Sequence, residues 1–525
     1  MPLKEPIMKA TIAAHSSFSS TESSLSKPEH LAETEIMNTN SFAKLKFGEK
    51  VVFLRNYITV EPMLACYIMP SVLSGLAVQN MNLQKACRVN LGYSDEICSA
   101  LVERKTTNFS QEEIEVQTLV AGMTVWKTAL QSSIPAFLIM FLGAWSDRRG
   151  RRKPCMLLPI IGEFLTTMGL ILCTYYFMEW PMEVAGVIEA IFPALTGGWM
   201  TMFMAIFSYI ADITTVEMRT FRIGVVNIFV SLGIPIGTAL SGVLYKQIGF
   251  YGIFSISAMF YLAGFFYGVV YIQEANSKID EDTPGGCQDF FNPRHVLETF
   301  RIITRKRDGN TRTLIVLLML VFSVIVGPLY GETAVMYLYG RYRFNWDEVD
   351  FSMFATYCVV INLVGTLISI TVFSRWLKLD DTIIGIMACL SKVAASFIYA
   401  FSKTPTLFYI APLVDIISGT GVIAMRSITT KIVASNEQGK IHSLFGVCEA
   451  IVPLIYSPMY SVLYVNTLKT LPGAFFLLGA AMTLPAVGIF AWMYILQKRD
   501  RINSENPVKG PDIFKYTIPV NEIVP

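Results

Sequence analysis

The chain has 525 residues, of which 53% are hydrophobic and only 16% are charged, and its mean hydropathy is +0.49. Soluble globular proteins are about one quarter charged, so long apolar runs at this composition exclude an ordinary soluble domain and indicate a polytopic membrane protein. The formal net charge of +2 gives no basic excess for binding a nucleic-acid polymer.

The cysteines and histidines form no metal-binding pattern. The nine cysteines include no Cys-x-x-Cys pair, and none of the four histidines lies deep inside an apolar run. This argues against a metal centre, a haem or a histidine proton relay. We expect no metal and no cofactor.

The polar segments divide the chain into parts. Residues 1–50 are rich in serine and threonine and lack the apolar core of a signal peptide, which predicts a disordered cytosolic tail without a cleaved signal. We expect an N-terminal six-helix bundle over 51–274, a cytosolic connector over 275–312, a C-terminal six-helix bundle over 313–497 and a cytosolic tail over 498–525.

The first span is expected at about 57–78, and the polar segment 80–117 follows it. This segment contains Cys87, Cys98 and Asn108, which opens the glycosylation sequon Asn-Phe-Ser. Disulfides and N-linked glycans both belong to an oxidising lumenal or extracellular side. The segment is therefore predicted to be an external glycosylated loop. A Cys87–Cys98 disulfide is the preferred interpretation, and two free thiols are the alternative.

Spans two and three, at about 119–142 and 155–177, flank the short cationic turn GAWSDRRGRRK at 143–153. The positive-inside rule places such a turn in the cytosol. Asp147 lies at a helix end, where it can pair with Arg148, Arg151 or Arg152 of its own loop or with a neighbouring helix. The pattern Gly-x-x-x-Asp-Arg-x-Gly-Arg-Arg resembles the loop signature of major facilitator transporters. The alternative is an ordinary cytosolic loop whose aspartate caps a helix.

Further apolar runs predict spans at about 184–210, 223–244, 251–272, 313–337, 351–373, 382–400, 407–431, 443–465 and 473–496. The predicted fold class is an all-α membrane protein with twelve transmembrane helices in two six-helix bundles and both termini in the cytosol. The segments 212–245 and 431–464 share the order of polar turn, basic residue and Gly- or Pro-bearing span. This internal repeat supports two halves with a substrate site between them near the bilayer midplane.

Charged side chains inside spans mark candidate sites, because burying one costs about 2.5–3.5 kcal/mol on insertion scales. Arg426 is the first candidate for binding an anionic substrate, since a guanidinium binds a carboxylate or phosphate through two parallel hydrogen bonds. A continuous span ten would place Asp415 on the same face, about 16 Å away in depth. Lys392 can neutralise Asp415 across the helix pair; a purely structural pair is the alternative.

Two further residues are assigned to substrate binding. Lys127 is the second cation candidate; the alternative is that its side chain extends to the membrane surface. Tyr330 can stack on a planar substrate or belong to the interfacial aromatic belt.

Carboxylates within the spans are the candidates for carrying a proton. Glu332 is the first choice and Glu449 the second, because a carboxyl group at low dielectric can take up a proton from acidic fluid and release it inside. Glu163 and Glu189 fit less well, since spans three and four are expected to face lipid in part or to pack structurally.

Four segments carry a family resemblance. The loop signature, ITVEP at 58–62, ADITTVEMRTFR at 211–222 and MRSITTKIVASNEQGK at 425–440 together resemble the solute carrier family that includes the proton-coupled folate transporter and the thymic stromal cotransporter. The resemblance implies proton-coupled import of an organic anion of the folate, cyclic dinucleotide or muropeptide class. The implied location is the plasma membrane, with an endolysosomal membrane as the alternative. The implied form is a monomer or weak homodimer.

The resemblance also implies roles for single residues. Asp147 and Arg151 match an inner-loop gate pair, and Arg426 matches a span-ten arginine used in coupling and substrate binding. Asn227 and Gly198 stand where the folate transporter has acidic residues, which is a departure from that member.

An inner gate is predicted from the cytosolic loops. Arg152, Asp212 and Arg222 are expected to join Asp147 and Arg151, with Asp212 pairing with Arg219 or Arg222. These salt bridges would form when the protein opens outward and break when it opens inward. The rival interpretation is a non-transporting receptor or scaffold that keeps the fold. An enzyme is not expected, because no nucleophile–base set, phosphate loop or metal constellation is present.

The gate assignment predicts that Asp147→Ala or Arg151→Ala lowers substrate uptake several-fold while surface expression persists. Loss of the ion pair removes an interaction needed in one of the two alternating states. Uptake and surface labelling measured on the same cells would test this, and normal uptake by both variants would contradict the assignment.

Overall fold

The computed structural model describes residues 58–105, 108–214, 216–274, 311–432 and 438–505. The predicted N-terminal tail, nearly all of the connector and most of the C-terminal tail lie outside these residues. The described helices pack within one compact unit, Ile58–Thr214 with Arg219–Pro525. A second unit, Met1–Tyr57 with Thr215–Met218, consists almost entirely of residues outside the described ranges.

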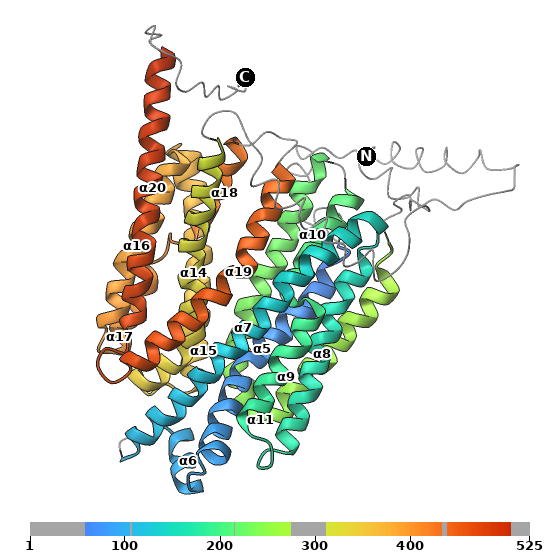
Figure 1. The fold of residues 1–525 in the computed structure, drawn as a ribbon, viewed down its shortest axis with the longest axis vertical. Helices are drawn as coiled ribbons and strands as arrows, with labels where there is room; N and C mark the ends of the chain where they lie inside the picture. Colours follow the sequence, from blue (N-terminus) through green and yellow to red (C-terminus); the bar gives the residue numbers. More distant parts are fainter. Residues whose placement is uncertain (1–57, 106–107, 215, 275–310, 433–437, 506–525) are drawn as a thin grey trace, which may run out of the picture. The chain divides into compact units, whose positions relative to one another are not determined.

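Every regular element of the described ranges is a helix (Figure 1). The first half contains α5 (Glu61–Lys85), the π-helical turn η1 (Ala86–Asn90), α6 (Asp95–Val102), α7 (Ser110–Arg149), α8 (Lys153–Tyr175), α9 (Met182–Thr196), α10 (Gly198–Ile213) and α11 (Val216–Tyr271). The second half contains α14 (Thr311–Phe344), α15 (Glu348–Ile368), the π-helical segment η3 (Ser369–Trp376), α16 (Asp381–Phe401), α17 (Pro405–Val414), α18 (Thr420–Ile432), α19 (Gln438–Thr467) and α20 (Ala474–Glu505).

Nine segments of the described ranges are long and apolar enough to cross a membrane. One of them, Arg222–Tyr271, has 50 residues, which at 1.5 Å per residue is about 75 Å and more than twice the roughly 30 Å hydrocarbon core. Gly249, with a φ of 64°, interrupts its helical backbone, so α11 contains the predicted spans five and six. Span ten is divided between α17 and α18, and α19 covers span eleven. The nine segments therefore cover ten of the twelve predicted spans, and α17, α18 and α19 cover the other two.

The helices leave apolar faces without a partner inside the chain. On the first part of α11, large side chains spaced three or four residues apart are exposed: Ile228, Leu232, Ile236, Leu240 and Val243. A soluble protein would bury such a stripe, so a helix exposing it is suited to contact with lipid. Other side chains of the same chain fill buried cores: one lies in the second half and the outer ends of α5 and α7, and two smaller ones lie in the first half.

Two spans are interrupted part-way along their length. Span four divides into α9 and α10 at Gly197, whose φ of 78° suits glycine. Span ten divides at the turn Asp415–Gly419, between the end of α17 and the start of α18. The prediction of a continuous span ten is therefore wrong, and so is the argument that Asp415 and Arg426 share one helical face. Irregular backbone at this depth requires protein around it, because lipid offers no hydrogen bonds.

The break in span ten is possible because α15 approaches it closely. A Cβ atom added at Gly365 would lie 1.6 Å from the carbonyl oxygen of Ile416. No side chain larger than hydrogen fits there without moving backbone, so Gly365 fixes the position of the break against α15.

Gly365→Ala is therefore expected to destabilise the protein by about 1–3 kcal/mol, the usual cost of overpacking a close contact. The matched control is Gly446→Ala on α19, where an added Cβ meets nothing within 4 Å. Thermal unfolding of both purified variants in detergent measures the difference. Equal unfolding temperatures would show that the close approach does not constrain the fold.

Candidate functional site

A cluster of three charged side chains lies between α14, α16 and the break in span ten. The Nζ of Lys392 donates to Oε2 of Glu332 at 2.7 Å and lies 3.7 Å from Oδ2 of Asp415. All three side chains are at least four-fifths buried. Oε1 of Glu332 and Oδ1 of Asp415 are buried without a hydrogen-bond partner among the described residues. Two carboxylates thus share one ammonium group, which leaves an excess negative charge when both are ionised.

Neighbouring helices form the wall of this cluster. A Cβ added at Gly479 of α20 would lie 2.9 Å from Oε1 of Glu332 and 3.1 Å from the hydroxyl of Tyr460, so both polar atoms border Gly479. The Tyr460 hydroxyl is also buried without a hydrogen-bond partner. Ser391 donates to the carbonyl of Val414, which satisfies one backbone group freed by the break. The cluster is therefore surrounded by protein and contains three polar atoms able to bind a proton or hydroxyl group.

A second ion pair joins α18 to α19. The guanidinium of Arg426 lies 3.6 Å from Oε2 of Glu449, and the two side chains are 48% and 32% exposed. The first candidate for binding the substrate anion thus pairs with the second candidate for carrying the proton. Unlike the buried cluster, this pair is accessible to a solute. Tyr330 lies on α14, two residues before Glu332, and its carbonyl accepts a hydrogen bond from Ser457.

The first half has a balanced ion pair. Glu189 on α9 accepts hydrogen bonds from Lys127 on α7 at 2.6 Å and from Asn82 on α5 at 2.8 Å. The alternative, that the side chain of Lys127 extends to the membrane surface, does not hold, because its ammonium is paired with Glu189 in the protein interior. Glu163 on α8 has no ion-pair partner within the described part of the chain.

The predicted inner gate residues pair within the first half. Arg152 binds Asp212, with Nε 2.7 Å from Oδ2, and also donates to Ser146 at 3.0 Å. Arg222 donates to Thr59 and lies 3.7 Å from Glu61. The predicted partner of Asp212 was a different arginine, and the structure corrects it to Arg152. Arg151 is exposed, whereas the side chain of Asp147 lies outside what the structure describes.

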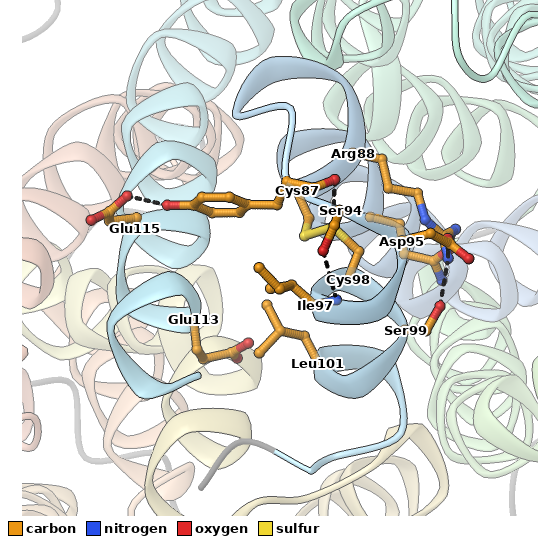
Figure 2. Close-up of a disulfide and its surroundings, with 12 residues drawn as sticks. Cys87, Arg88, Ser94, Asp95, Ile97, Cys98, Ser99, Leu101, Glu113 and Glu115 are labelled. Atoms are coloured by element: carbon orange, nitrogen blue, oxygen red, sulfur yellow. Dashed lines mark hydrogen bonds and ion pairs between the residues drawn. A yellow bond between two sulfur atoms is a disulfide. The ribbon is translucent and has the colours of Figure 1, made fainter. Parts of the chain in front are cut away.

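The loop after the first span has a compact structure (Figure 2). A disulfide links Cys87 of η1 to Cys98 of α6. Arg88 pairs with Asp95 at 3.0 Å, and Ser94 caps α6 by accepting from the backbone N–H of Ile97.

Side chains beyond the disulfide extend this ordered region. The hydroxyl of Tyr93 donates to Glu115, and this hydrogen bond raises the pKa of Tyr93 to about 12. Asn108, the predicted glycosylation site, is exposed just before α7.

The family model of the Major Facilitator Superfamily matches residues 115–457. The chain belongs to the Major Facilitator Superfamily. It is 23% identical over 463 residues to the probable peptidoglycan muropeptide transporter SLC46 of Drosophila melanogaster, covering 87% of this chain and 88% of that protein. It is 25% identical over 453 residues to the lysosomal proton-coupled steroid conjugate and bile acid symporter SLC46A3 of Gallus gallus, covering 84% and 94%.

Another relative is the proton-coupled folate transporter of Rattus norvegicus, 23% identical over 394 residues and covering 71% of this chain and 79% of that protein. Solved structures show the same fold. The human organic anion transporter MFSD10 superposes with a TM-score of 0.56 at 13% identity, covering 82% of this chain and 98% of the other. A mutant of the peptide transporter POT in complex with alafosfalin gives 0.56 at 10% identity, covering 81% and 93%.

These comparisons confirm the predicted all-α major facilitator fold and the family resemblance. As a member of this superfamily, the chain is a multi-pass membrane protein. Its relatives are named as transporters of small organic substrates.

Sequence reasoning missed several polar residues of these sites. Asn82 and Tyr460 are uncharged, so they give little signal inside an apolar run. Arg341 and Glu113, described below, were placed in loops because the expected spans ended too early. The spacing of Glu113 and Gln117, one helical turn apart, could have indicated that α7 continues outward.

Lys392→Met is expected to destabilise the protein by about 3–5 kcal/mol, because removing one partner of a buried ion pair leaves uncompensated charge. The triple variant Lys392→Met/Glu332→Gln/Asp415→Asn, which removes all three charges, is expected to regain most of the loss. Thermal unfolding of the purified proteins measures both. A single variant as stable as the native chain would show that the cluster is not held by charge compensation.

Proposed function

We propose that this chain is a secondary active transporter that imports an organic anion together with a proton by alternating access. The observation that carries the proposal is the cluster of Glu332, Lys392 and Asp415, in which two carboxylates share one ammonium. An excess negative charge is costly at low dielectric, and one proton on either carboxylate removes it. The proton gradient then supplies the energy, and no cofactor is required.

Neutralisation of a carboxylate by a proton also favours Arg426 as the anion site. Its partner Glu449 holds the guanidinium at 3.6 Å in a partly exposed position. A proton on Glu449 would neutralise the carboxylate and release the guanidinium, which can then bind a carboxylate or phosphate of the substrate with two hydrogen bonds. Proton binding and anion binding would in this way favour each other.

The relatives support this class of substrate. Two are named as proton-coupled, for steroid conjugates and bile acids and for folate, and a third is named as a probable muropeptide transporter. The proposed substrate is an organic anion of the folate, cyclic dinucleotide or muropeptide class. The proposed location is the plasma membrane, with the endolysosomal membrane as the alternative, since one relative is named as lysosomal.

Uptake into proteoliposomes holding the purified chain tests the proposal. A reduced folate, a cyclic dinucleotide and a muropeptide are offered at acidic and neutral external pH. We expect acid to stimulate uptake of one of them. Asp415→Asn is expected to remove the stimulation, because the cluster is then neutral at either pH, and Arg426→Ala is expected to remove uptake.

The matched control is Lys246→Ala, which breaks an exposed ion pair with Asp347 and should leave uptake unchanged. Uptake that is insensitive to pH in the native chain would contradict proton coupling. If none of the three anions is taken up, another substrate, or a receptor that keeps the transporter fold, becomes the favoured interpretation.

A further inference from the structure

A buried ion pair joins the two halves of the chain at the end that carries the disulfide loop. Arg341, near the end of α14, donates from Nε to Oε1 of Glu113 at 2.7 Å and from a terminal nitrogen to Oε2 at 3.3 Å. Glu113 lies in the first turn of α7, and the two side chains are only 3% and 4% exposed. The guanidinium and carboxylate thus meet through two hydrogen bonds, the strongest geometry for such a pair.

Hydrogen bonds extend this contact to a third helix. Gln117, one turn along α7 from Glu113, donates to Oε1 of Glu113 at 2.8 Å. The hydroxyl of Tyr464 on α19 donates to Oε1 of Gln117 at 2.9 Å. Gln117 and Tyr464 are fully buried. The first half is therefore connected to both α14 and α19 by one continuous polar network.

The loop before α7 takes part in the same network. The guanidinium of Arg341 also donates to the backbone carbonyl of Leu101 at 3.0 Å, and Asn345 donates to the carbonyl of Arg104 at 2.8 Å. Leu101 lies in the last turns of α6, which the Cys87–Cys98 disulfide ties to the end of α5. Figure 2 shows Leu101 and Glu113 close to this disulfide. The disulfide therefore fixes the segment that presents the Leu101 carbonyl to Arg341.

The ion pairs at the opposite end have a different arrangement. Arg152–Asp212 and Arg222–Glu61 each join residues of the first half. The described structure thus has a buried connection between the halves at the disulfide end. Alternating access requires such a connection to form when this end closes and to separate when it opens.

We propose that Glu113, Gln117, Arg341, Tyr464 and the carbonyl of Leu101 form an outer latch, which holds the external side closed and must separate each time the protein opens outward. This inference rests on the proposed alternating-access function, but its test does not use transport. Opening separates Glu113 from Arg341 and exposes both to water, so neither charge remains buried without a partner. Weakening the latch is therefore expected to shift the resting population toward the outward-open state.

Hydrogen–deuterium exchange of the purified full chain in lipid nanodiscs tests the latch. Glu113→Gln keeps the shape of the side chain and removes its charge. We expect several-fold faster exchange in peptides covering 95–120 and 335–348, together with slower exchange in the inner-loop peptides around 143–153 and 211–222. Local loosening alone would accelerate the first group without slowing the second, and that result would overturn the proposal.

Three further variants make the test specific. Lys246→Ala removes an ion pair that also joins the halves, between the exposed Lys246 and the partly buried Asp347, and it should leave both groups of peptides unchanged. Arg341→Lys keeps the charge but loses the fork of hydrogen bonds, so it should give a smaller shift in the same direction. The exchanged pair Glu113→Arg/Arg341→Glu should return exchange toward the native pattern.

The outcomes separate the latch from the transport proposal. If Glu113→Gln does not fold, Arg341→Lys carries the test, and native exchange in that variant would overturn the latch. If exchange rises in the first group of peptides and falls in the second, but the chain transports none of the tested anions, the latch is retained and only the substrate class is refuted. Proton-coupled uptake with no exchange difference between Glu113→Gln and Lys246→Ala would retain the transporter and reject the latch.

Discussion

One electrostatic constraint recurs throughout the structure, the pairing of charged side chains that lie away from water. An isolated charge in a low-dielectric interior is too costly to keep, whereas a paired and hydrogen-bonded charge is tolerated. The first half follows this rule with Lys127 and Glu189. In the outer latch, Glu113 lies between two buried guanidinium groups, 2.7 Å from Arg341 and 3.9 Å from Arg104. The cluster around Lys392 departs from this rule toward negative charge, since one ammonium serves both Glu332 and Asp415. The departure from balance is what makes this cluster the candidate site of proton binding.

The two interrupted spans face a similar constraint, because their free backbone polar groups also need partners within the protein. A break frees N–H and C=O groups that lipid cannot satisfy, so it is confined to places enclosed by other helices. In span ten the break follows directly on α17 and places Asp415 at its start, beside Lys392 of α16. Gly365 on α15 lets the neighbouring helix close around the freed carbonyls. The charged cluster and the irregular backbone therefore occupy one enclosed region, as in transporters whose discontinuous helices form the binding site.

The fold could be predicted from the sequence because apolar runs and cationic loops are local signals with strong physical causes. The proximity of Lys392 and Asp415 followed from the charges of neighbouring spans. The ion pair between Lys392 and Glu332 could not be predicted, because no local sequence feature indicates how α14 is rotated against α16. The break in span ten was missed because regular helical spacing assumes that a span continues, and the close approach of the distant Gly365 leaves no local signal. Arg341 was missed because a cation near the end of a span usually belongs to the solvated surface.

The Arg426–Glu449 pair has a consequence for selectivity. Glu449 is covalently part of the chain, so it acts as a tethered competitor for the guanidinium at a high effective concentration. A free inorganic anion such as chloride makes one weak contact and would not displace it. A larger organic anion that also contacts the surrounding helices gains enough interaction to do so. In the proposed transport function, the carboxylate of Glu449 on α19 would thus exclude abundant small anions and leave Arg426 available to solutes that also contact the neighbouring helices.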